Sequence, residues 1–365
     1  MRIKNNYKEC LTNVACSIRK YFELDYKHNT LDYLDNILEQ KQPKNVVLIL
    51  LDGLGANILD NTLDKDSFLR KNKYKNITSV FPATTTAATT SIRTGLNPIE
   101  HGFLGWNMYI KPIDKVVTLY MKKEKGTDEH VKTSDFLKLK SISNEINDNK
   151  KYNSIELFPF PTGSTVTYSS LDEMIDIILE ESKKEGKRFI YAYNDEPDHT
   201  MHELGPYAKE VKKLIEESNN KLEELSNKLE DTLLIILADH GHIKVDNLFL
   251  KDYPEVYNML ERNTSSEQRA VSFKVKKEYI NEFPKVFNKY FGKWFKLYPK
   301  KEIIESKLYG DGKEHELFND ALGDFIAIAE DSNKTIISQG DDILYSQHAG
   351  YTDDEVYIPL IIVSK

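Results

Sequence analysis

Histidines and carboxylates gather at a few places in the sequence, in combinations that could bind metal ions. Five of the nine histidines lie beside acidic residues or next to an apolar run, and these are His199, His202, His240, His242 and His348. Neutral imidazole together with carboxylate, and without thiolate, is a ligand set of catalytic zinc and of related divalent metals. The sequence therefore indicates metal-assisted chemistry for which separate segments must meet.

The spacing within these groups suggests how the side chains are presented. Asp198 and His202 are four residues apart, so on a helical turn they share one face. Asp239 and His240 are adjacent and cannot share a face of a regular element, so a turn must splay them, which Gly241 permits. Distributed over separate strand ends, the set suggests two metal sites with a hydroxyl nucleophile between them.

A threonine-rich run, ATTTAATTSIRTG, supplies the candidate hydroxyl at the start of a short helix that Gly95 closes. In one interpretation, Thr84 or Thr85 only caps this helix. In the other, a hydroxyl at the helix N-terminus lies beside unpaired N–H groups that favour an anion. Such a hydroxyl becomes an effective nucleophile when a base or a metal lowers its pKa.

Three apolar runs position the acidic groups. Residues 45–51, 188–194 and 232–238 read as strands of a parallel sheet buried on both faces, and each leads into aspartate. The carboxyl ends of such strands form the ligand crevice of open α/β sheets. Carboxylates that merely cap the following helices are the alternative for any one run, but they explain all three runs and their histidines less well.

The remaining segments suggest a domain organisation. We expect residues 1–40 to form a helical lead-in packed on the core, 41–248 together with 341–365 to form the catalytic core, and 249–340 to form an inserted cap lobe. The polar stretch 110–170 reads as connecting segments that could shape a substrate cleft. The aromatic residues of 283–298 are expected to form the core of the lobe, with base stacking as the alternative.

Composition excludes several classes of function. A formal net charge of -8 argues against a polymeric nucleic-acid partner. The sequence has no apolar run of membrane-spanning length, and its first residues lack the apolar core of a signal peptide, so we expect no membrane partner and a cytoplasmic location. Cys10 and Cys16 have neither metal-site nor redox spacing and are expected to be reduced thiols.

Five motifs give the sequence a specific resemblance. LDGLG, FPATTTAATTSIRTGLNPIEHG, NDEPDHTMHELGP, ADHGH and HAGY occur in an order that resembles the alkaline phosphatase superfamily, and closely its type I phosphodiesterase/nucleotide pyrophosphatase branch. The resemblance implies an α/β fold: an alkaline-phosphatase-like three-layer αβα sandwich with a mostly parallel central sheet and a small inserted cap lobe.

The resemblance also implies two divalent metal ions, with Zn²⁺ expected, and a small phosphate-ester substrate. The positions that match the family's ligands are Asp52, Asp239 and His240 for one metal, and Asp198, His202 and His348 for the other. Thr85 matches the family's nucleophile. The implied mechanism is in-line attack of a metal-bound Thr85 alkoxide on phosphorus, a covalent phospho-threonine, and hydrolysis by water activated on the other metal.

The sequence departs from the family at three places. The phosphate-binding asparagine of eukaryotic members would fall on Trp106, so Asn107, one place later, is the candidate. Residues 86–88 replace the Phe-Pro-Asn step that supports base stacking, which weakens the expectation of a nucleotide substrate. His199 and His242 match no family ligand, and we expect them to be outer partners or surface residues.

The leading hypothesis is a two-metal hydrolase that cleaves a phosphodiester or pyrophosphate bond through a phospho-threonine. A phosphonate or phosphate-monoester hydrolase of the same superfamily is the alternative, and a non-catalytic metabolite-binding member is a second. A monoesterase usually needs an added cation at the phosphoryl group. The only arginine near the nucleophile, Arg93, lies eight residues into the helix, which argues mildly against that role.

Overall fold

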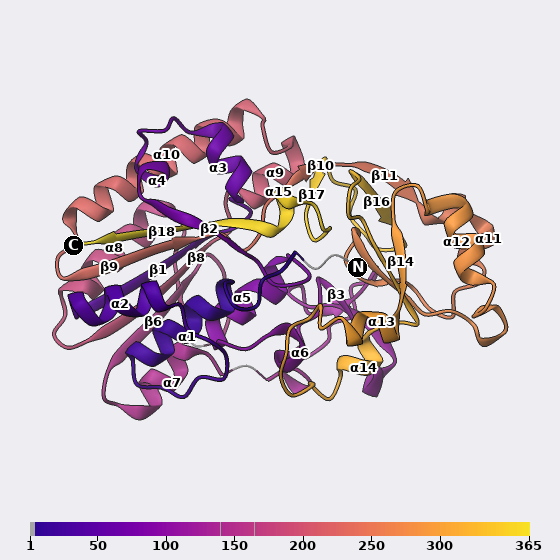
Figure 1. The fold of residues 1–365 in the computed structure, drawn as a ribbon, viewed down its shortest axis with the longest axis horizontal. Coiled ribbons are helices and arrows are strands. Elements are labelled where there is room, and N and C mark those ends of the chain that lie inside the picture. The colour runs from indigo at the N-terminus through magenta and orange to yellow at the C-terminus, as the bar shows by residue number, and fades with distance from the viewer. Residues whose placement is uncertain (1–3, 139, 164) are drawn as a thin grey trace.

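A mostly parallel seven-stranded sheet forms the centre of the fold in the computed structural model, which describes residues 4–138, 140–163 and 165–365 (Figure 1). In spatial order its strands are β2 (Lys73–Thr78), β18 (Tyr357–Ser364), β9 (Thr232–Leu237), β1 (Asn45–Leu51), β8 (Arg188–Asn194), β6 (Asn153–Phe158) and β7 (Val166–Thr167). Only β18 runs against its neighbours β9 and β2. Every residue of β1, β8 and β9 is buried, which explains why these segments read as continuous apolar runs.

The register of these strands brings the acidic segments to one edge. Leu51 pairs with Asn194 across β1 and β8, and Leu50 pairs with Leu237 across β1 and β9. The three strands therefore end at nearly the same level. Asp52 comes directly after β1 and Asp239 two residues after the end of β9, so the two must lie close together.

Helices cover both faces of this sheet, which gives the expected three layers. Figure 1 shows α3, α4 and α10 on one face and α1, α2, α5 and α7 on the other. The helices of the core are α1 (Leu11–Tyr21), α2 (Asp32–Lys41), α3 (Ala56–Thr62), α4 (Phe68–Lys71), α5 (Thr85–Thr94), α6 (Pro98–His101), α7 (Ile142–Asn149), α8 (Leu171–Lys183), α9 (Asp198–Leu204), α10 (Lys209–Lys228) and α15 (Asp353–Val356). The mixed α/β fold with a mostly parallel sheet is confirmed.

The first helix, α1, is deeply buried, although residues 1–40 were expected only to pack on the core as a lead-in. Residues 11–19 of α1 are all buried, and α1 packs against α5, the threonine-rich helix. Cys10 and Cys16 are buried free thiols, and burial raises the pKa of each to about 11. Within the described residues, no helix is both long and apolar enough to cross a membrane.

A second seven-stranded sheet, antiparallel throughout, lies beside the core. Its strands in spatial order are β14 (Lys296–Pro299), β15 (Phe325–Ile328), β13 (Ala270–Phe273), β12 (Ser265–Ser266), β3 (Asn107–Ile110), β4 (Lys115–Thr118) and β5 (Lys123–Glu124). The expected lobe of residues 249–340 thus supplies four strands. Residues 107–124, expected as connecting segments, supply the other three, because Asn107 pairs with Ser266 and joins the two parts.

The aromatic residues of the lobe form its own core, as expected. Phe283, Phe287 and Phe291 of α12 (Phe283–Phe291) are fully buried and pack with Phe273 and Phe325 of the second sheet. The other elements here are α11 (Pro254–Tyr257), α13 (Lys300–Glu305), α14 (Phe318–Ala321) and the short pairs β10 (Ile243–Lys244) with β17 (Ser346–Gln347) and β11 (Asp246–Phe249) with β16 (Lys334–Ile337). The three buried phenylalanine rings of α12 are therefore not free to stack on a ligand.

A buried ion pair joins the second sheet to the end of the chain. Arg269, just before β13, donates from Nε and Nη2 to the two carboxylate oxygens of Glu355 in α15, at 2.6 and 2.9 Å. Both side chains are fully buried. Arg269 also donates to the carbonyls of Ser332 and Lys334, so its charge is well satisfied.

Replacing Arg269 should therefore destabilise the protein strongly. R269M leaves the Glu355 carboxylate buried without its cation, and we expect the free energy of unfolding to fall by about 3–5 kcal/mol. Urea denaturation measures this loss. The control is K289A, which removes the exposed Lys289–Glu255 pair and should leave the free energy of unfolding nearly unchanged. Equal losses for the two variants would contradict the role given to Arg269.

Candidate active site

The first group of candidate ligands combines residues that follow β1 and β9. His240 Nε2 lies 3.2 Å from Asp52 Oδ1 and 3.5 Å from Asp239 Oδ2, and all three residues are buried. The other oxygen of Asp52 accepts from the Tyr193 hydroxyl, and Asp239 Oδ1 accepts from the N–H of Gly53. The two oxygens that face His240 have no hydrogen-bond partner among the described residues.

The second group surrounds Asp198, the first residue of α9. Asp198, His202, His242 and His348 each offer one ligand atom, and these atoms lie within 4.8 Å of one another. His202 Nε2 is 3.3 Å from Asp198 Oδ2, across one helical turn as the spacing predicted. Asp198 also belongs with Asp52 and His240, so its carboxylate lies between the two groups.

The hydrogen bonds of the three expected histidine ligands fix their orientation. Nδ1 of each faces a backbone carbonyl oxygen: Gly241 for His240 at 3.2 Å, Ser346 for His202 at 2.9 Å, and Ala83 for His348 at 3.2 Å. A carbonyl only accepts, so in the neutral ring Nδ1 carries the proton and Nε2 presents a lone pair. All three lone pairs point into the two groups.

His101, outside these groups, has the opposite arrangement. Its Nδ1 accepts from the N–H of Phe103 at 3.1 Å, so its proton is on Nε2, which lies 3.0 Å from Ser91 Oγ. The unprotonated Nε2 atoms directed at carboxylates thus distinguish the histidines of the site from His101. Lone pairs facing one another at 3.2–3.5 Å repel unless a cation lies between them. The donor set therefore fits divalent metal ions.

The charges of the site lead to the same conclusion. Burial, and then the negative charge of Asp198, raises the pKa of Asp52 well above its ordinary value. Burial, and then Asp52, does the same to Asp239. Burial lowers the pKa of His202, but the Asp198 carboxylate outweighs it and raises that pKa to about 9. The crowded carboxylates thus hold positive charge strongly, whether as protons or as metal ions.

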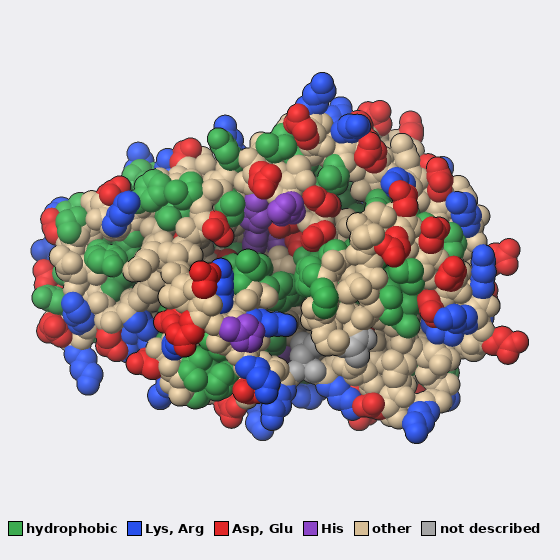
Figure 2. Space-filling model, turned by 180° about the vertical axis from the view of Figure 1, so that it is seen from behind, with side chains coloured by type: hydrophobic (Ala, Val, Ile, Leu, Met, Phe, Trp, Pro, Cys, Tyr) green, Lys and Arg blue, Asp and Glu red, His purple; other side chains and the backbone are tan. Residues whose placement is uncertain are grey.

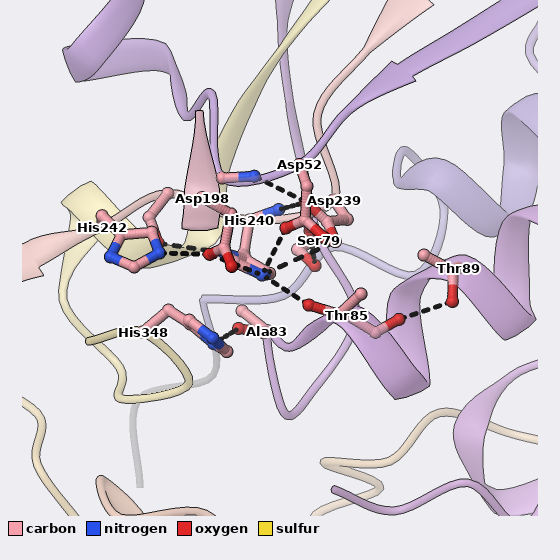
Figure 3. A network of polar contacts seen from close by, with 12 residues as sticks. Asp52, Ser79, Ala83, Thr85, Thr89, Asp198, Asp239, His240, His242 and His348 are labelled. Carbon is pink, nitrogen blue, oxygen red and sulfur yellow. Dashed lines mark hydrogen bonds and ion pairs between the residues drawn. The ribbon is translucent and has the colours of Figure 1, made fainter. Parts of the chain in front are cut away.

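Thr85, the first residue of α5, is the threonine that faces the site. Its Oγ1 lies 3.3 Å from His240 Nε2, and Figure 3 shows the hydroxyl pointing toward that ring. Thr84 is the N-cap residue but makes no capping hydrogen bond with its side chain, and both Thr84 and Thr86 are completely buried. The arrangement favours Thr85 over its two neighbours.

The same helix tolerates many threonines because their hydroxyls return to its own backbone. Thr89, Thr90 and Thr94 donate to the carbonyls four residues earlier, at 2.6–2.7 Å. This internal bonding satisfies the buried hydroxyls of Thr90 and Thr94 within the helix, and Thr89 Oγ1 also lies 2.5 Å from the Tyr120 hydroxyl. Thr85 has no such bond and remains free to meet a substrate.

Close backbone packing sets the turn after Asp239 and His240. A Cβ on Gly241 would lie 1.9 Å from the carbonyl oxygen of Asp354, and one on Gly55 would lie 2.4 Å from the Cα of Gly241. From the sequence, Gly241 is expected to permit the turn that splays Asp239 and His240. The structure gives a different reason, which is that no side chain fits where the loops after β1 and β9 touch.

A cavity of about 680 Å³ opens onto the site. Figure 2 shows histidine side chains gathered in a central hollow with acidic side chains beside them. Thr85, Asp198, His202 and His348 line one part of the cavity. The second sheet supplies the opposite wall, which includes Trp106, Asn107, Thr118, Lys123 and Glu267.

Asn107, the candidate phosphate-binding residue, lies in this wall. Its side-chain oxygen accepts from the Thr118 hydroxyl at 2.7 Å, and its Nδ2 is 3.4 Å from Asp341 Oδ1. Glu267 lies nearby and accepts from the N–H of Trp106 at 2.6 Å, and burial raises the pKa of Glu267 to about 7. Sequence reasoning missed Glu267, because its segment carries no motif.

The two histidines outside the expected ligand set differ from each other. His199 is exposed and lines the cavity, consistent with a surface residue. His242 is buried within the second ligand group, which the sequence interpretation did not predict. The signal was present as the spacing His-Gly-His in residues 240–242.

Arg93 is not available to a ligand. Its guanidinium pairs with Glu156, with Nη2 to Oε2 at 2.6 Å, and lies over the ring of Phe158 at 4.9 Å from the centroid. Among the residues that the structure describes, no arginine lines the cavity.

The fold is similar to solved structures of ectonucleotide pyrophosphatase/phosphodiesterase 5. The human protein is 20% identical with a TM-score of 0.68, covering 87% of each chain. The murine protein, as an inactive threonine-to-alanine variant in complex with AMP, is 20% identical with a TM-score of 0.66, covering 86% of this chain and 87% of that one. At this identity the likeness shows a shared fold.

Sequence comparison identifies the family. No curated protein is similar enough in sequence to count as a relative. The family model described as type I phosphodiesterase/nucleotide pyrophosphatase, however, matches residues 46–352, a stretch that contains all the candidate ligands and Thr85. The chain therefore belongs to the type I phosphodiesterase/nucleotide pyrophosphatase family and is a hydrolase of that kind.

Proposed function

We propose that the protein cleaves a phosphodiester or pyrophosphate bond of a small substrate through a phospho-threonine on Thr85, with two divalent metal ions, most simply Zn²⁺. The observation that carries this proposal is the position of the Thr85 hydroxyl. It lies on the cavity wall, 3.3 Å from His240 Nε2, beside both groups of ligand side chains. The inactive form of the murine structural relative also lacks a threonine.

In this proposal, each residue has a role that follows from its place. Asp52, Asp239 and His240 would hold one metal ion, and Asp198, His202 and His348 the other. When bound, the two cations would lower the pKa of the attacking hydroxyl and neutralise charge on the phosphoryl oxygens. Thr85 Oγ1 forms the new bond to phosphorus as the bond to the leaving oxygen breaks, and water then cleaves the Thr85–phosphorus bond.

The charge of the cavity supports a diester over a monoester. A monoester presents two negative charges on its phosphoryl group, whereas a diester presents one. Arg93 is held by Glu156, and Lys123 is the only lysine or arginine in the described lining. The AMP bound by the murine relative makes nucleotide diesters suitable first substrates. In this chain, Trp106 is the cavity-lining aromatic residue on which a base could stack.

A cytoplasmic location stays a prediction.

The nucleophile can be tested with zinc-loaded protein and bis-p-nitrophenyl phosphate. We expect T85A to lose diester turnover by about 10⁴-fold or more, since removing a covalent nucleophile abolishes the main route. The control is T90A, whose hydroxyl only bonds to the Thr86 carbonyl and whose loss should leave turnover unchanged. Acid-quenched wild type should carry the aryl phosphoryl group on the Thr85 peptide. If the enzyme hydrolyses p-nitrophenyl phosphate but not bis-p-nitrophenyl phosphate, it is instead a monoesterase.

Metal content should separate the two ligand groups. Wild type is expected to bind two zinc ions, and H240Q, H202Q and D198N one each, because each substitution removes a side chain assigned to only one of the two ions. Elemental analysis after dialysis against trace zinc measures the stoichiometry. His315 lies outside both groups, so H315Q should retain two. A D198N variant that keeps both ions would contradict the role assigned to Asp198.

Asn107 is proposed to bind a phosphoryl oxygen through Nδ2. One of its two amide hydrogens is directed to Asp341, which leaves the other for the substrate. N107A should lower kcat/KM for the diester by about 10- to 100-fold, the size of a hydrogen bond to a charged group. Metal content measured alongside should stay at the wild-type level. An unchanged kcat/KM would show that another group binds the phosphate.

A further inference from the structure

His242 lies in the second ligand group although no family ligand corresponds to it. It is buried, its Nε2 contacts Asp198 Oδ1, and its ring centroid is 4.6 Å from that of His202 and 5.1 Å from that of His348. Figure 3 shows its ring beside Asp198, on the side away from Thr85. Its ligand atom lies within 4.8 Å of those of the other three members.

Ser346 determines where the ring of His242 carries its proton. The Ser346 hydroxyl donates its single hydrogen to the carbonyl of Met201 at 2.6 Å. Its oxygen can then only accept from His242 Nδ1, which is 3.0 Å away. Nδ1 therefore holds the proton of the neutral ring, and Nε2 directs a lone pair at Asp198. This is the same arrangement as in the three expected histidine ligands.

An outer-partner role does not fit this arrangement. A histidine that supports a ligating carboxylate donates an N–H to it. If neutral His242 donated from Nε2 to Asp198, its bare Nδ1 would face the Ser346 oxygen at 3.0 Å with no hydrogen between them. With the proton on Nδ1, the bare Nε2 would instead face the Asp198 carboxylate. A cation bound by both Nε2 and Asp198 removes that repulsion and keeps the hydrogen bond from Nδ1 to Ser346.

We infer that His242 is a fourth protein ligand of the metal ion held by Asp198, His202 and His348. The inference rests on the proposed two-metal site and adds a residue to it. The sequence explains how one short motif serves both groups, because Gly241 separates His240 and His242 and each ring enters a different group. Ser346 then orients two ligands at once, His202 through its carbonyl and His242 through its hydroxyl.

The inference makes the two metal sites unequal. Three imidazoles and one carboxylate complete a four-coordinate zinc set, whereas the group of Asp52, Asp239 and His240 has three protein ligands and faces Thr85. Three protein ligands with an open position are typical of catalytic zinc, and four of structural zinc. The ion beside His242 should therefore leave more slowly in the presence of a chelator than the ion beside Thr85.

A crystal structure of the zinc-loaded wild-type protein is the direct test. We expect anomalous density in the Asp198 group with zinc about 2.0–2.1 Å from His242 Nε2. Zinc bound there with His242 Nε2 more than about 3 Å away would overturn the inference but leave the proposed function standing. No zinc in the Asp198 group at saturating concentration would overturn both.

A pair of variants tests the same point in solution. H242Q should change the visible d–d absorption of the Co²⁺-loaded protein and weaken its tighter zinc site by more than the about 10- to 100-fold that loss of an outer partner costs. H199Q is the control, because His199 lines the same cavity outside both groups. Thermal unfolding of both variants checks that they are folded. A Co²⁺ spectrum unchanged in H242Q would contradict ligation.

Discussion

Repulsion among buried carboxylates at one edge of the central sheet is the constraint on which the site depends. Asp52 and Asp239 are almost fully buried, and Asp198 lies close to Asp52. Charges of one sign in a poorly solvated place repel one another far more strongly than in water, and each also loses its hydration. Parallel strands ending in register force this crowding, so the fold needs positive charge there. In the proposed site, the four surrounding histidines, each with Nε2 turned inward, would supply that charge by binding metal ions.

The two sheets supply different parts of the site. The parallel sheet presents the candidate ligands and Thr85, whose positions follow from strand ends that cannot shift without disrupting a buried core. The antiparallel sheet presents the facing wall of the cavity, which is polar and built from short strands. The buried pair of Arg269 and Glu355 joins the two parts. In the proposed function, the chemistry would take place on the first sheet, and we expect the second sheet to select the substrate.

The sequence predicts the elements whose pattern is strong and local. β1 and β8 match the expected bounds, because continuous apolar runs that end in aspartate have few other interpretations. The joining of residues 107–124 to the lobe was not predictable, because short strands carry little periodicity and the one pairing that joins them to the lobe is between the distant residues Asn107 and Ser266. Glu267 was missed for the same reason. His242 was visible in the sequence, but the side that its ring faces depends on Ser346, which only the folded chain places beside it.

The charge balance of the site also limits what it can cleave. Two divalent ions would bring four positive charges, and the carboxylates of Asp52, Asp198 and Asp239 would remove three, since ligating carboxylates are deprotonated and ligating histidines neutral. One positive charge would remain before the substrate binds. A phosphodiester, with one negative charge, matches it, whereas a monoester dianion would leave an excess that the cavity has little means to neutralise. Arg93, the nearest arginine in sequence, is already paired with Glu156. The proposed preference for a diester thus rests on side chains outside the metal groups as much as on the ligands themselves.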